Sequence, residues 1–217
     1  MDDNMNSTVF LGRGSATREF DPANLSTREQ YKLLTGSIVP RPIALVTTLG
    51  SAGVNAAPFS FFNVVGVAPP TIMLSIGMRG EELEKDTLRN LRAVPEFVVH
   101  IVHEDEREAM QLCAGYYPPE VNETELAGFE VLPSRKVRPP RIARCPAQFE
   151  CVVKNIIPVG AVPYHMVLGE IVAMHFGEDI VSQNLHVDLD RLSPLGRLAG
   201  PASYVRLSDR LSLAPVD

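Results

Sequence analysis

The chain has no tryptophan, 6% aromatic residues and only three cysteines among its 217 residues. Cys113, Cys145 and Cys151 are odd in number and show no CxxC spacing, so neither a disulfide framework nor a metal site is expected from them. Reduced thiols in the cytoplasm are the simplest explanation. No apolar run approaches the roughly 20 residues of a membrane helix, and the start of the chain shows no secretory signal pattern.

Basic residues are also scarce relative to acidic ones, and the formal net charge is −6. This balance argues against nucleic acid as a partner, because proteins that bind it usually present a basic face. A local Arg/Lys cluster could still hold a phosphate on an acidic protein. The chain contains no Ser-His-Asp set, paired-carboxylate spacing, P-loop or GxGxxG motif, so any dinucleotide would bind without a Rossmann domain.

Proline, by contrast, is abundant, with 18 residues spread along the chain. Such a distribution favours many short elements joined by turns. Apolar patterns predict strands at these ranges: Ile43–Thr48, Val54–Ser60, Thr71–Ile76, Phe97–Val102, Gln148–Val159 and His165–Phe176. Short helices are expected after the capping box of Ser26 and Glu29, from Lys85 to Arg92, and over Glu104–Cys113.

The remaining segments are expected to carry little regular structure. Ala114–Gly128 is predicted to be a loop, and the tail from Asp188 is predicted to be turn-rich until Tyr204. Residues 1–25 show no periodicity and are interpreted as an N-terminal extension, which leaves 26–217 as one domain. Several hairpins with a few peripheral helices predict a mainly β fold, an antiparallel barrel.

The most informative segment is Pro40–Asn63, PRPIALVTTLGSAGVNAAPFSFFN. Its two strand-like runs flank the turn-rich LGSAG, and the second run ends in small, polar and aromatic residues. Small residues let backbone N–H groups approach a flat ligand, polar groups bond its edge, and aromatic rings cover its face. The same residues also suit a plain hairpin with a bulge at Pro58, so composition alone leaves both interpretations open.

The pattern RPIALVTT…G…N.APFSFFN resembles the flavin reductase-like family, the FMN-binding split barrels that include flavoredoxin-type proteins. Further similar segments follow in the family's order: Arg79, Lys85–Thr87 with Asn90, Phe97–Val99, Tyr117–Pro119, Glu125–Gly128, and His165 with Leu168–Val172. The resemblance covers about Thr35 to Tyr204. It implies a split barrel, Greek-key-like and antiparallel, with a few peripheral helices.

The resemblance also implies non-covalent FMN and assigns its contacts. The expected cofactor-binding residues are Arg41, Val46, Thr47, Asn55, Ala57, Pro58, Phe59, Ser60, Asn63, Ser75, Arg79, Lys85 and Thr87. Because a phosphate monoester prefers charged donors and helix-start N–H groups, Arg79, Lys85 and Thr87 are expected to hold it. The alternative is a solvated surface, since Glu81, Glu82 and Glu84 nearly cancel the positive charge.

Histidines supply one catalytic candidate and no metal site. His100 and His103 lie three apart on a strand and so face opposite sides, which prevents them from chelating one ion. His100 stands where relatives often carry Asn. By the family's pattern, His165 lies near the flavin or the nicotinamide, where it could donate a hydrogen bond or carry a proton. A loop histidine without a function is the alternative.

The function implied by the resemblance is an NAD(P)H-dependent flavin reductase, an oxidoreductase with NAD(P)H as its co-substrate. Its electrons would pass to free flavin, to oxygen, or to a partner such as a flavin-dependent monooxygenase or a redox protein. A homodimer is implied as well. Two alternatives stay open: a flavoredoxin-like electron carrier with FMN but no NAD(P)H site of its own, and a split-barrel interaction module that has lost flavin.

Overall fold

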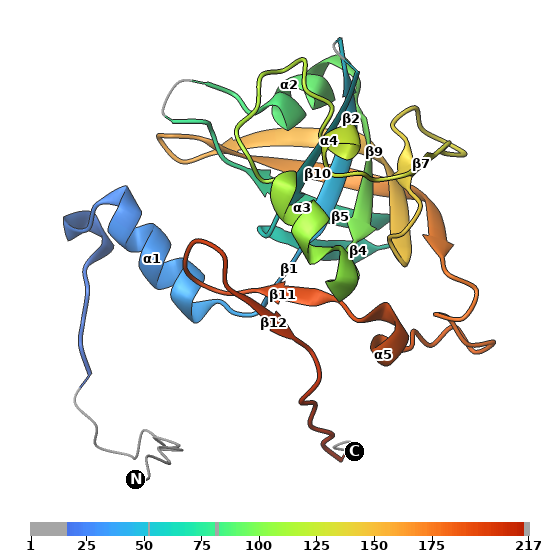
Figure 1. The fold of residues 1–217 in the computed structure, drawn as a ribbon. Helices are drawn as coiled ribbons and strands as arrows, with labels where there is room; N and C mark the ends of the chain where they lie inside the picture. Colours follow the sequence, from blue (N-terminus) through green and yellow to red (C-terminus); the bar gives the residue numbers. More distant parts are fainter. Residues whose placement is uncertain (1–16, 52, 81–82, 215–217) are drawn as a thin grey trace, which may run out of the picture.

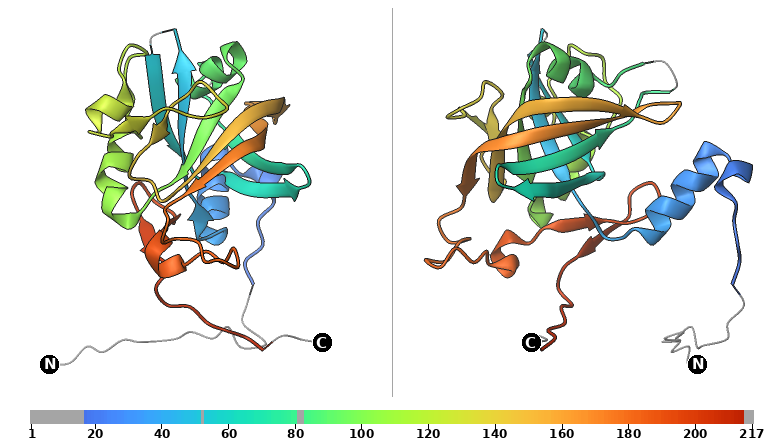
Figure 2. Two further views of the ribbon diagram at one scale, coloured as in Figure 1. Left: turned by 90° about the vertical axis from the view of Figure 1, so that its right-hand side faces the viewer. Right: turned by 180° about the vertical axis from the view of Figure 1, so that it is seen from behind.

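The structure, a computed structural model, describes residues 17–51, 53–80 and 83–214 (Figure 1). Residues 1–16 of the predicted N-terminal extension lie outside the described residues. So do Glu81 and Glu82, two of the acidic residues near Arg79 and Lys85. The main element is a seven-stranded antiparallel sheet with the order β3-β2-β6-β9-β10-β5-β4. Figures 1 and 2 show this sheet curling into a barrel, which confirms the predicted mainly β class with a few peripheral helices.

The elements have the following bounds. The barrel strands are β2 (Ala44–Gly50), β3 (Gly53–Phe59), β4 (Phe62–Val67), β5 (Pro70–Ile76), β6 (Glu96–Ile101), β9 (Ala147–Val159) and β10 (Tyr164–Phe176). The smaller sheets contain β1 (Arg41–Pro42), β7 (Val131–Leu132), β8 (Arg141–Ile142), β11 (Leu195–Arg197) and β12 (Tyr204–Arg206). The helices are η1 (Pro22–Asn24), α1 (Thr27–Ser37), α2 (Asp86–Ala93), η2 (Glu104–Glu106), α3 (Arg107–Leu112), α4 (Glu123–Leu126) and α5 (Leu189–Leu192).

The predicted hairpin forms as β2 and β3, which pair in register from Ala44↔Phe59 to Gly50↔Gly53. Gly53 has φ 120°, a backbone conformation that side chains with a Cβ rarely adopt, so glycine is needed at this turn. β3 ends the strand order and therefore has one edge without a neighbouring strand. Proline suits such an edge because it lacks the N–H that a ladder requires, which explains Pro58 without a bulge.

The barrel interior holds the larger of two apolar cores. Leu74 and Ile76 of β5, Phe97 of β6 and Val167 of β10 are fully buried there, and Leu88 of α2 closes one end. A Cβ on Gly169 would lie 2.4 Å from Cζ of Phe97. Gly169 is thus the close backbone approach that a glycine inside a strand indicates.

The second core packs under α3 on the outer face of β2. Leu45, Ala56, Met110 and Ile142 form its centre. Because neighbouring residues of β2 face opposite sides, Leu45 belongs to this core while Val46 belongs to the barrel. The hairpin therefore has little exposed side-chain surface along β2, and its free edge on β3 is the part open to a ligand.

Helix α1 forms where the capping box predicts it. The Ser26 hydroxyl accepts from the Glu29 N–H, and the Glu29 carboxylate accepts from the Ser26 N–H at 2.9 Å. Figures 1 and 2 show α1 projecting from the barrel beside the loop between β11 and β12. No helix among the described residues is long and apolar enough to cross a membrane.

Two segments contain more structure than the sequence predicts. The expected loop Ala114–Gly128 contains α4, whose first turn is capped by the Asn122 side chain accepting from the Thr124 N–H at 3.0 Å. The expected turn-rich tail contains α5, β11 and β12, and β11 pairs with β1. These elements are only two to four residues long. Their formation depends on distant partners, which local patterns do not reveal.

Candidate functional site

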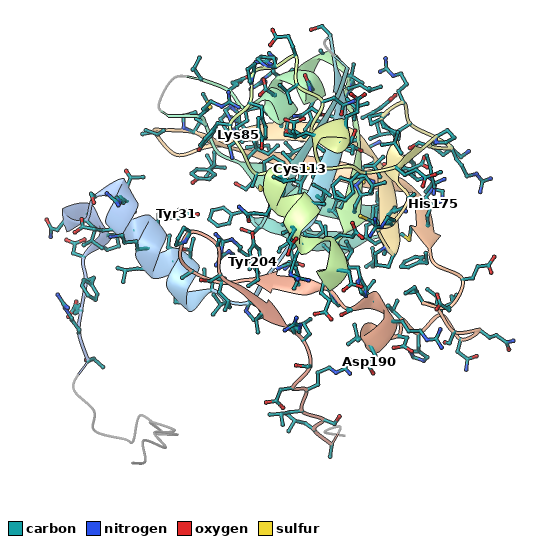
Figure 3. The ribbon with its side chains drawn as sticks, in the orientation of Figure 1. Tyr31, Lys85, Cys113, His175, Asp190 and Tyr204 are labelled. Carbon is teal, nitrogen blue, oxygen red and sulfur yellow. The ribbon has the colours of Figure 1, made fainter. Side chains whose placement is uncertain are left out.

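A polar cleft of about 350 Å³ lies against the free edge of β3, between α1 and the start of α2. Its lining residues are Tyr31, Asn55, Ala57, Pro58, Phe59, Arg79, Lys85, Asp86, Thr87, Cys113, Ala114, Gly115, Tyr116, Glu123 and Arg197. Figure 3 shows Tyr31 at α1, with Lys85 above it and Cys113 to the right of both. Seven of the predicted cofactor-binding residues meet here: Asn55, Ala57, Pro58, Phe59, Arg79, Lys85 and Thr87.

One wall of the cleft is fixed by buried hydrogen bonds centred on Asn55. Its Nδ2 donates to Glu123 Oε1 at 2.9 Å, while its Oδ1 accepts from the hydroxyls of Thr48 at 3.2 Å and Thr87 at 3.0 Å. The Ala56 N–H donates to Glu123 Oε2 at 3.1 Å. The Thr87 hydroxyl therefore donates within the wall, so Thr87 could donate to a ligand only through its backbone N–H, while Asn55 Nδ2 has a second N–H besides the one that Glu123 accepts.

Glu123 is a buried carboxylate that the sequence analysis missed. Its side chain joins α4 to β3, and it is 7% exposed. Burial raises the pKa of Glu123, although the hydrogen bonds from Ala56 and Asn55 oppose this effect. Burial and the neighbouring Glu123 likewise raise the pKa of Cys113 to about 12, so this thiol is protonated and unreactive near neutral pH.

The opposite end of the cleft is cationic. Arg79 Nη2 lies 3.2 Å from Asp86 Oδ2, and Arg89 also pairs with Asp86, so one carboxylate serves two guanidinium groups there. The Arg79 Nε is buried and has no hydrogen-bond partner among the described residues. Glu84 pairs with Arg92 at 2.9 Å and so does not neutralise Arg79 or Lys85. The solvated-surface alternative is thereby weakened.

Lys85 occupies the N-cap position of α2 without capping it by a side-chain hydrogen bond. The first N–H groups of α2 consequently have no side-chain partner at this end. The Lys85 ammonium lies 5.5 Å from the centre of the Phe59 ring, and burial together with nearby Arg79 lowers the pKa of Lys85. Unused charged donors at a helix start form a suitable site for a phosphate group.

The other predicted contacts lie outside the cleft. Arg41 is buried and donates to the carbonyls of Thr35 at 2.6 Å, Ile38 at 3.0 Å and Leu198 at 3.0 Å. It therefore ties α1 to the segment after β11. Ser60 lines an adjoining hollow of about 120 Å³ and accepts from Arg41 Nε at 3.4 Å.

The other predicted cofactor-binding residues on barrel strands do not line the cleft. Val46 and Thr47 are fully buried in β2 between β3 and β6, and the Thr47 hydroxyl donates to the Pro140 carbonyl at 2.6 Å. Asn63 lies on β4 and Ser75 on β5, and neither lines the cleft. The direct side-chain contacts expected from these four residues have no support in the geometry of this subunit.

The two histidines singled out by sequence are both buried. His165 lies on β10 opposite Ile76, is 7% exposed and does not line the cleft, so its catalytic role stays a prediction that this geometry does not support. His100 donates from Nδ1 to the Leu45 carbonyl and accepts the Ile142 N–H at Nε2, each at 2.9 Å. Burial lowers the pKa of His100 to about 4, so it is a neutral structural residue.

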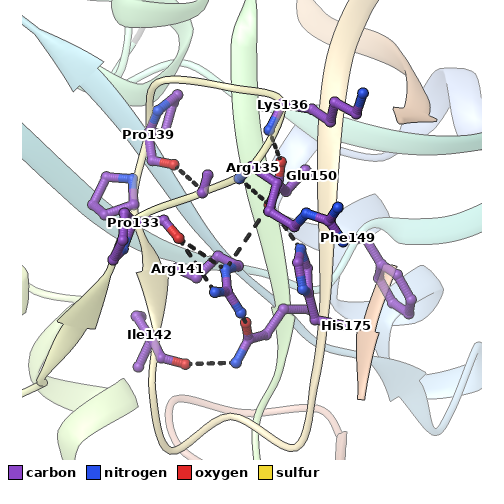
Figure 4. A network of polar contacts seen from close by, with 12 residues as sticks. Pro133, Arg135, Lys136, Pro139, Arg141, Ile142, Phe149, Glu150 and His175 are labelled. Atoms are coloured by element: carbon purple, nitrogen blue, oxygen red, sulfur yellow. Dashed lines mark hydrogen bonds and ion pairs between the residues drawn. The ribbon is translucent and has the colours of Figure 1, made fainter. Parts of the chain in front are cut away.

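A second polar cluster lies on the side of the barrel away from α1 (Figure 4). Fully buried Glu150 accepts from the backbone N–H groups of Arg135 at 2.8 Å and Lys136 at 2.6 Å, and from His175 Nε2 at 2.7 Å. Arg141 Nη1 donates to the Gln148 side chain at 2.9 Å. Every one of these groups has a partner, so this Glu150 network is not a candidate binding site.

Comparison with known proteins identifies one family model and several solved structures that are similar to this chain. The sequence model of the flavin reductase like domain matches residues 35–195. The structure of nitrilotriacetate monooxygenase component B from Bacillus cereus is 34% identical, covers 91% of this chain and 99% of its own, and superposes with a TM-score of 0.87. The structure of the 2-nitrobenzoate 2-nitroreductase of Pseudomonas fluorescens is 39% identical, covers 92% and 96% of the two chains, and has a TM-score of 0.82.

A split-barrel protein of Shewanella frigidimarina shows the same fold at 18% identity, with a TM-score of 0.78 and coverage of 93% of this chain and 100% of its own. The barrel described above is therefore a split barrel, as the sequence resemblance implies. The resemblance itself is confirmed by the matched residues 35–195, which include the β2–β3 hairpin, the cleft segment from Arg79 to Thr87, and Glu123.

Proposed function

Because the chain belongs to the flavin reductase-like family, we propose that it is an NAD(P)H-dependent oxidoreductase that holds FMN non-covalently in the cleft. The observation that carries this proposal is the cationic end of the cleft, where, among residues 17–51, 53–80 and 83–214, Arg79 Nε has no hydrogen-bond partner and the start of α2 has no side-chain cap. These donors fit a phosphate group, and the chain offers no adenine-binding motif that would favour FAD. When bound, FMN would accept a hydride from reduced nicotinamide and pass the electrons to an acceptor.

Each part of the cleft has a separate role in this proposal. Arg79, Lys85 and the start of α2 bind the phosphate. The free edge of β3, from Ala57 to Phe59, forms the surface on which a flat ring would lie, and the Glu123 hydrogen bonds hold that edge in place. Cys113 is a neutral wall residue, because its raised pKa keeps the thiol protonated.

The test is a spectrum of the reconstituted protein followed by anaerobic titration with NADH and with NADPH. We expect a yellow protein after filtration and loss of the flavin bands with at least one reductant. A colourless protein that also fails to quench FMN fluorescence at micromolar concentration would refute the flavin assignment. Tight FMN that neither dinucleotide reduces would instead support the flavoredoxin-like electron carrier.

The electron acceptor needs its own test, because the similar proteins differ in what their names describe. One is a component of a monooxygenase, and the other is a nitroreductase, at 34% and 39% identity respectively. We propose a partner oxygenase, free flavin or oxygen as the acceptor, with direct reduction of a nitroaromatic acid as the second candidate. Steady-state NAD(P)H oxidation with free FMN, and then with 2-nitrobenzoate, separates these two classes of acceptor.

We also propose a homodimer in the cytoplasm. Exposed apolar side chains support the dimer: Leu34 of α1 and Ile38 directly after it are 55% and 61% exposed, and Val64 and Val67 of β4 are 57% and 84% exposed. The three cysteines are buried and unpaired, which supports a reducing compartment. Light scattering coupled to gel filtration should give twice the 23.8 kDa mass of one chain, and a mass of one chain would refute the dimer.

A further inference from the structure

A second hollow, of about 440 Å³, lies between α1 and the loop that joins β11 to β12. Its lining residues are Arg28, Tyr31, Lys32, Thr35, Arg197, Ala199, Gly200 and Pro201, and we call it the α1 groove. Tyr31 and Arg197 line both the groove and the cleft, so the two hollows adjoin. Tyr31 lies in the middle of α1, and Figure 3 shows it on the side of the helix nearer the barrel.

The α1 groove has a surplus of positive charge. Arg28 and Lys32 are exposed on α1, and no ion pair is recorded for either among the described residues. Glu29 lies close enough to Lys32 to offset part of its charge, and its carboxylate also accepts from the Ser26 N–H and hydroxyl. Because Arg28, Lys32 and Arg197 line the groove and no acidic residue among the described ones does, its mouth keeps a net positive charge.

The guanidinium groups of Arg197 and Arg41 add positive charge near the floor of the α1 groove. Arg197 donates to the carbonyls of Ser203 at 2.8 Å, Gly200 at 2.7 Å and Pro201 at 3.0 Å. Arg41 is likewise bonded to carbonyl oxygens and the Ser60 hydroxyl, and it lies close enough that the charge of Arg197 acts on it. Carbonyl oxygens satisfy the N–H donors but leave each unit charge uncancelled, so the floor of the groove stays positive.

The same two residues make the groove rigid before a ligand arrives. Arg41 links α1 to the segment after β11, and Arg197 donates to four carbonyls of the Leu198–Ser203 loop. The terminal nitrogens of both guanidinium groups are thus bonded to carbonyl oxygens. Their role is to place Arg28 and Lys32 opposite the loop in a fixed arrangement, which reduces the entropy lost when a ligand binds.

We propose that the α1 groove binds the phosphate-bearing adenosine half of the nicotinamide dinucleotide, with Arg28 and Lys32 as the residues that contact its phosphates. This inference rests on the proposed function, and it explains how a chain without a Rossmann motif binds a dinucleotide. The phosphate end of the cleft at Lys85 and the α1 groove are then two anion sites in adjoining hollows. One serves the flavin and the other serves the reductant.

The test uses the FMN-loaded protein and ADP as the probe, with adenosine as its uncharged counterpart. Calorimetry should show that the parent binds ADP more tightly than adenosine. The double variant Arg28→Glu/Lys32→Glu should weaken ADP binding and raise the KM for NAD(P)H by roughly tenfold to thirtyfold, the loss of two charged contacts. Its kcat and FMN fluorescence should stay within about twofold of the parent.

The matched control is Arg135→Glu/Lys136→Glu, which changes the net charge equally on the loop between β7 and β8, away from α1. It should leave the ADP affinity unchanged. An equal loss in this control, or equal binding of ADP and adenosine by the parent, would overturn the inference even if NAD(P)H reduces the flavin. If neither dinucleotide reduces the flavin but ADP binding depends on Arg28 and Lys32, the groove stands as a nucleotide-phosphate site and the proposed function fails instead.

Discussion

The cleft and the Glu150 network bury similar groups on two sides of one barrel, yet they differ in whether those groups are satisfied. In the Glu150 network, a fully buried carboxylate has four neighbours that donate or carry positive charge, and each side chain has a partner. In the cleft, Asp86 alone faces the guanidinium groups of Arg79 and Arg89, and the Lys85 ammonium has no recorded carboxylate partner among the described residues.

The difference separates a structural cluster from a binding site. Buried polar groups that satisfy one another hold the chain in place and leave no donor for a ligand. In the described part of the cleft, Arg79 Nε has no hydrogen-bond partner and Lys85 is a partly buried cation beside Arg79, which is the arrangement that the proposed phosphate would complete. The same carboxylate and guanidinium chemistry thus serves folding on one side and recognition on the other. The variants below test this distinction, from the largest expected effect to the smallest.

The substitution Glu150→Gln should cause the largest loss of stability. The N–H groups of Arg135 and Lys136 donate to different oxygens of Glu150, so a carboxamide would set its N–H₂ donor against one of them, and the free energy of unfolding should fall by about 3 kcal/mol. Urea denaturation measures this loss. Glu170→Gln is the matched control on β10, where the half-exposed pair with Lys154 should contribute under about 1 kcal/mol. Equal losses in the two variants would contradict the structural role of the Glu150 network.

Acid should destabilise the protein through His100, which neighbours that network. The pKa of His100 is about 4 in the folded protein and about 6.5 when unfolded, so the unfolded chain binds the extra proton first. Stability is therefore complete above pH 6.5 and falls as the pH is lowered towards 4, by about 3 kcal/mol in total. His100→Asn should flatten the stability profile between pH 6.5 and 4.5. A parent profile without a slope in this range would show that His100 titrates normally.

In the cleft, Lys85→Ala should affect the ligand and leave the fold intact. The loss of one charged contact of about 1.5–3 kcal/mol should weaken FMN binding roughly tenfold or more, as measured by fluorescence quenching. Riboflavin lacks the phosphate and should bind the variant and the parent about equally. Lys154→Ala, which removes an exposed lysine of β9, should change neither ligand's affinity. If Lys85→Ala weakens both ligands alike, Lys85 acts through the fold.

The elements that the sequence predicted correctly carry strong local signals. The capping box of Ser26 and Glu29 fixes the start of α1, and alternation with turn residues fixes the β2–β3 hairpin. The elements that it missed depend on partners far along the chain. β11, for example, pairs Arg197 with Arg41, and a three-residue segment carries no pattern that predicts such a pairing.

The residues of the cleft also fall into two groups, those that local sequence predicts and those that only the fold brings together. The predicted residues that meet in the cleft come from two short segments, Asn55–Phe59 and Arg79–Thr87, whose members are neighbours in sequence. Tyr31, Glu123 and Arg197 join them from α1, α4 and β11, and only the fold brings them there. Family resemblance also assigned Val46 and Thr47 to the ligand; their side chains are fully buried in β2 and do not line the cleft, so this assignment stays a prediction.

The smallest expected effect on FMN affinity comes from Glu123→Gln, which removes the buried negative charge in the cleft. Its one remaining oxygen can still accept the Ala56 N–H, while its N–H₂ group replaces the acceptor of Asn55 Nδ2. A phosphate at Lys85 should then meet less repulsion, so FMN affinity should rise about twofold to threefold at low salt and return to the parent value at high salt. Titration at two ionic strengths measures both effects. A weaker FMN affinity at both ionic strengths would mean that Glu123 acts mainly by holding Asn55 in place, and that its carboxylate belongs with the structural groups of the Glu150 network.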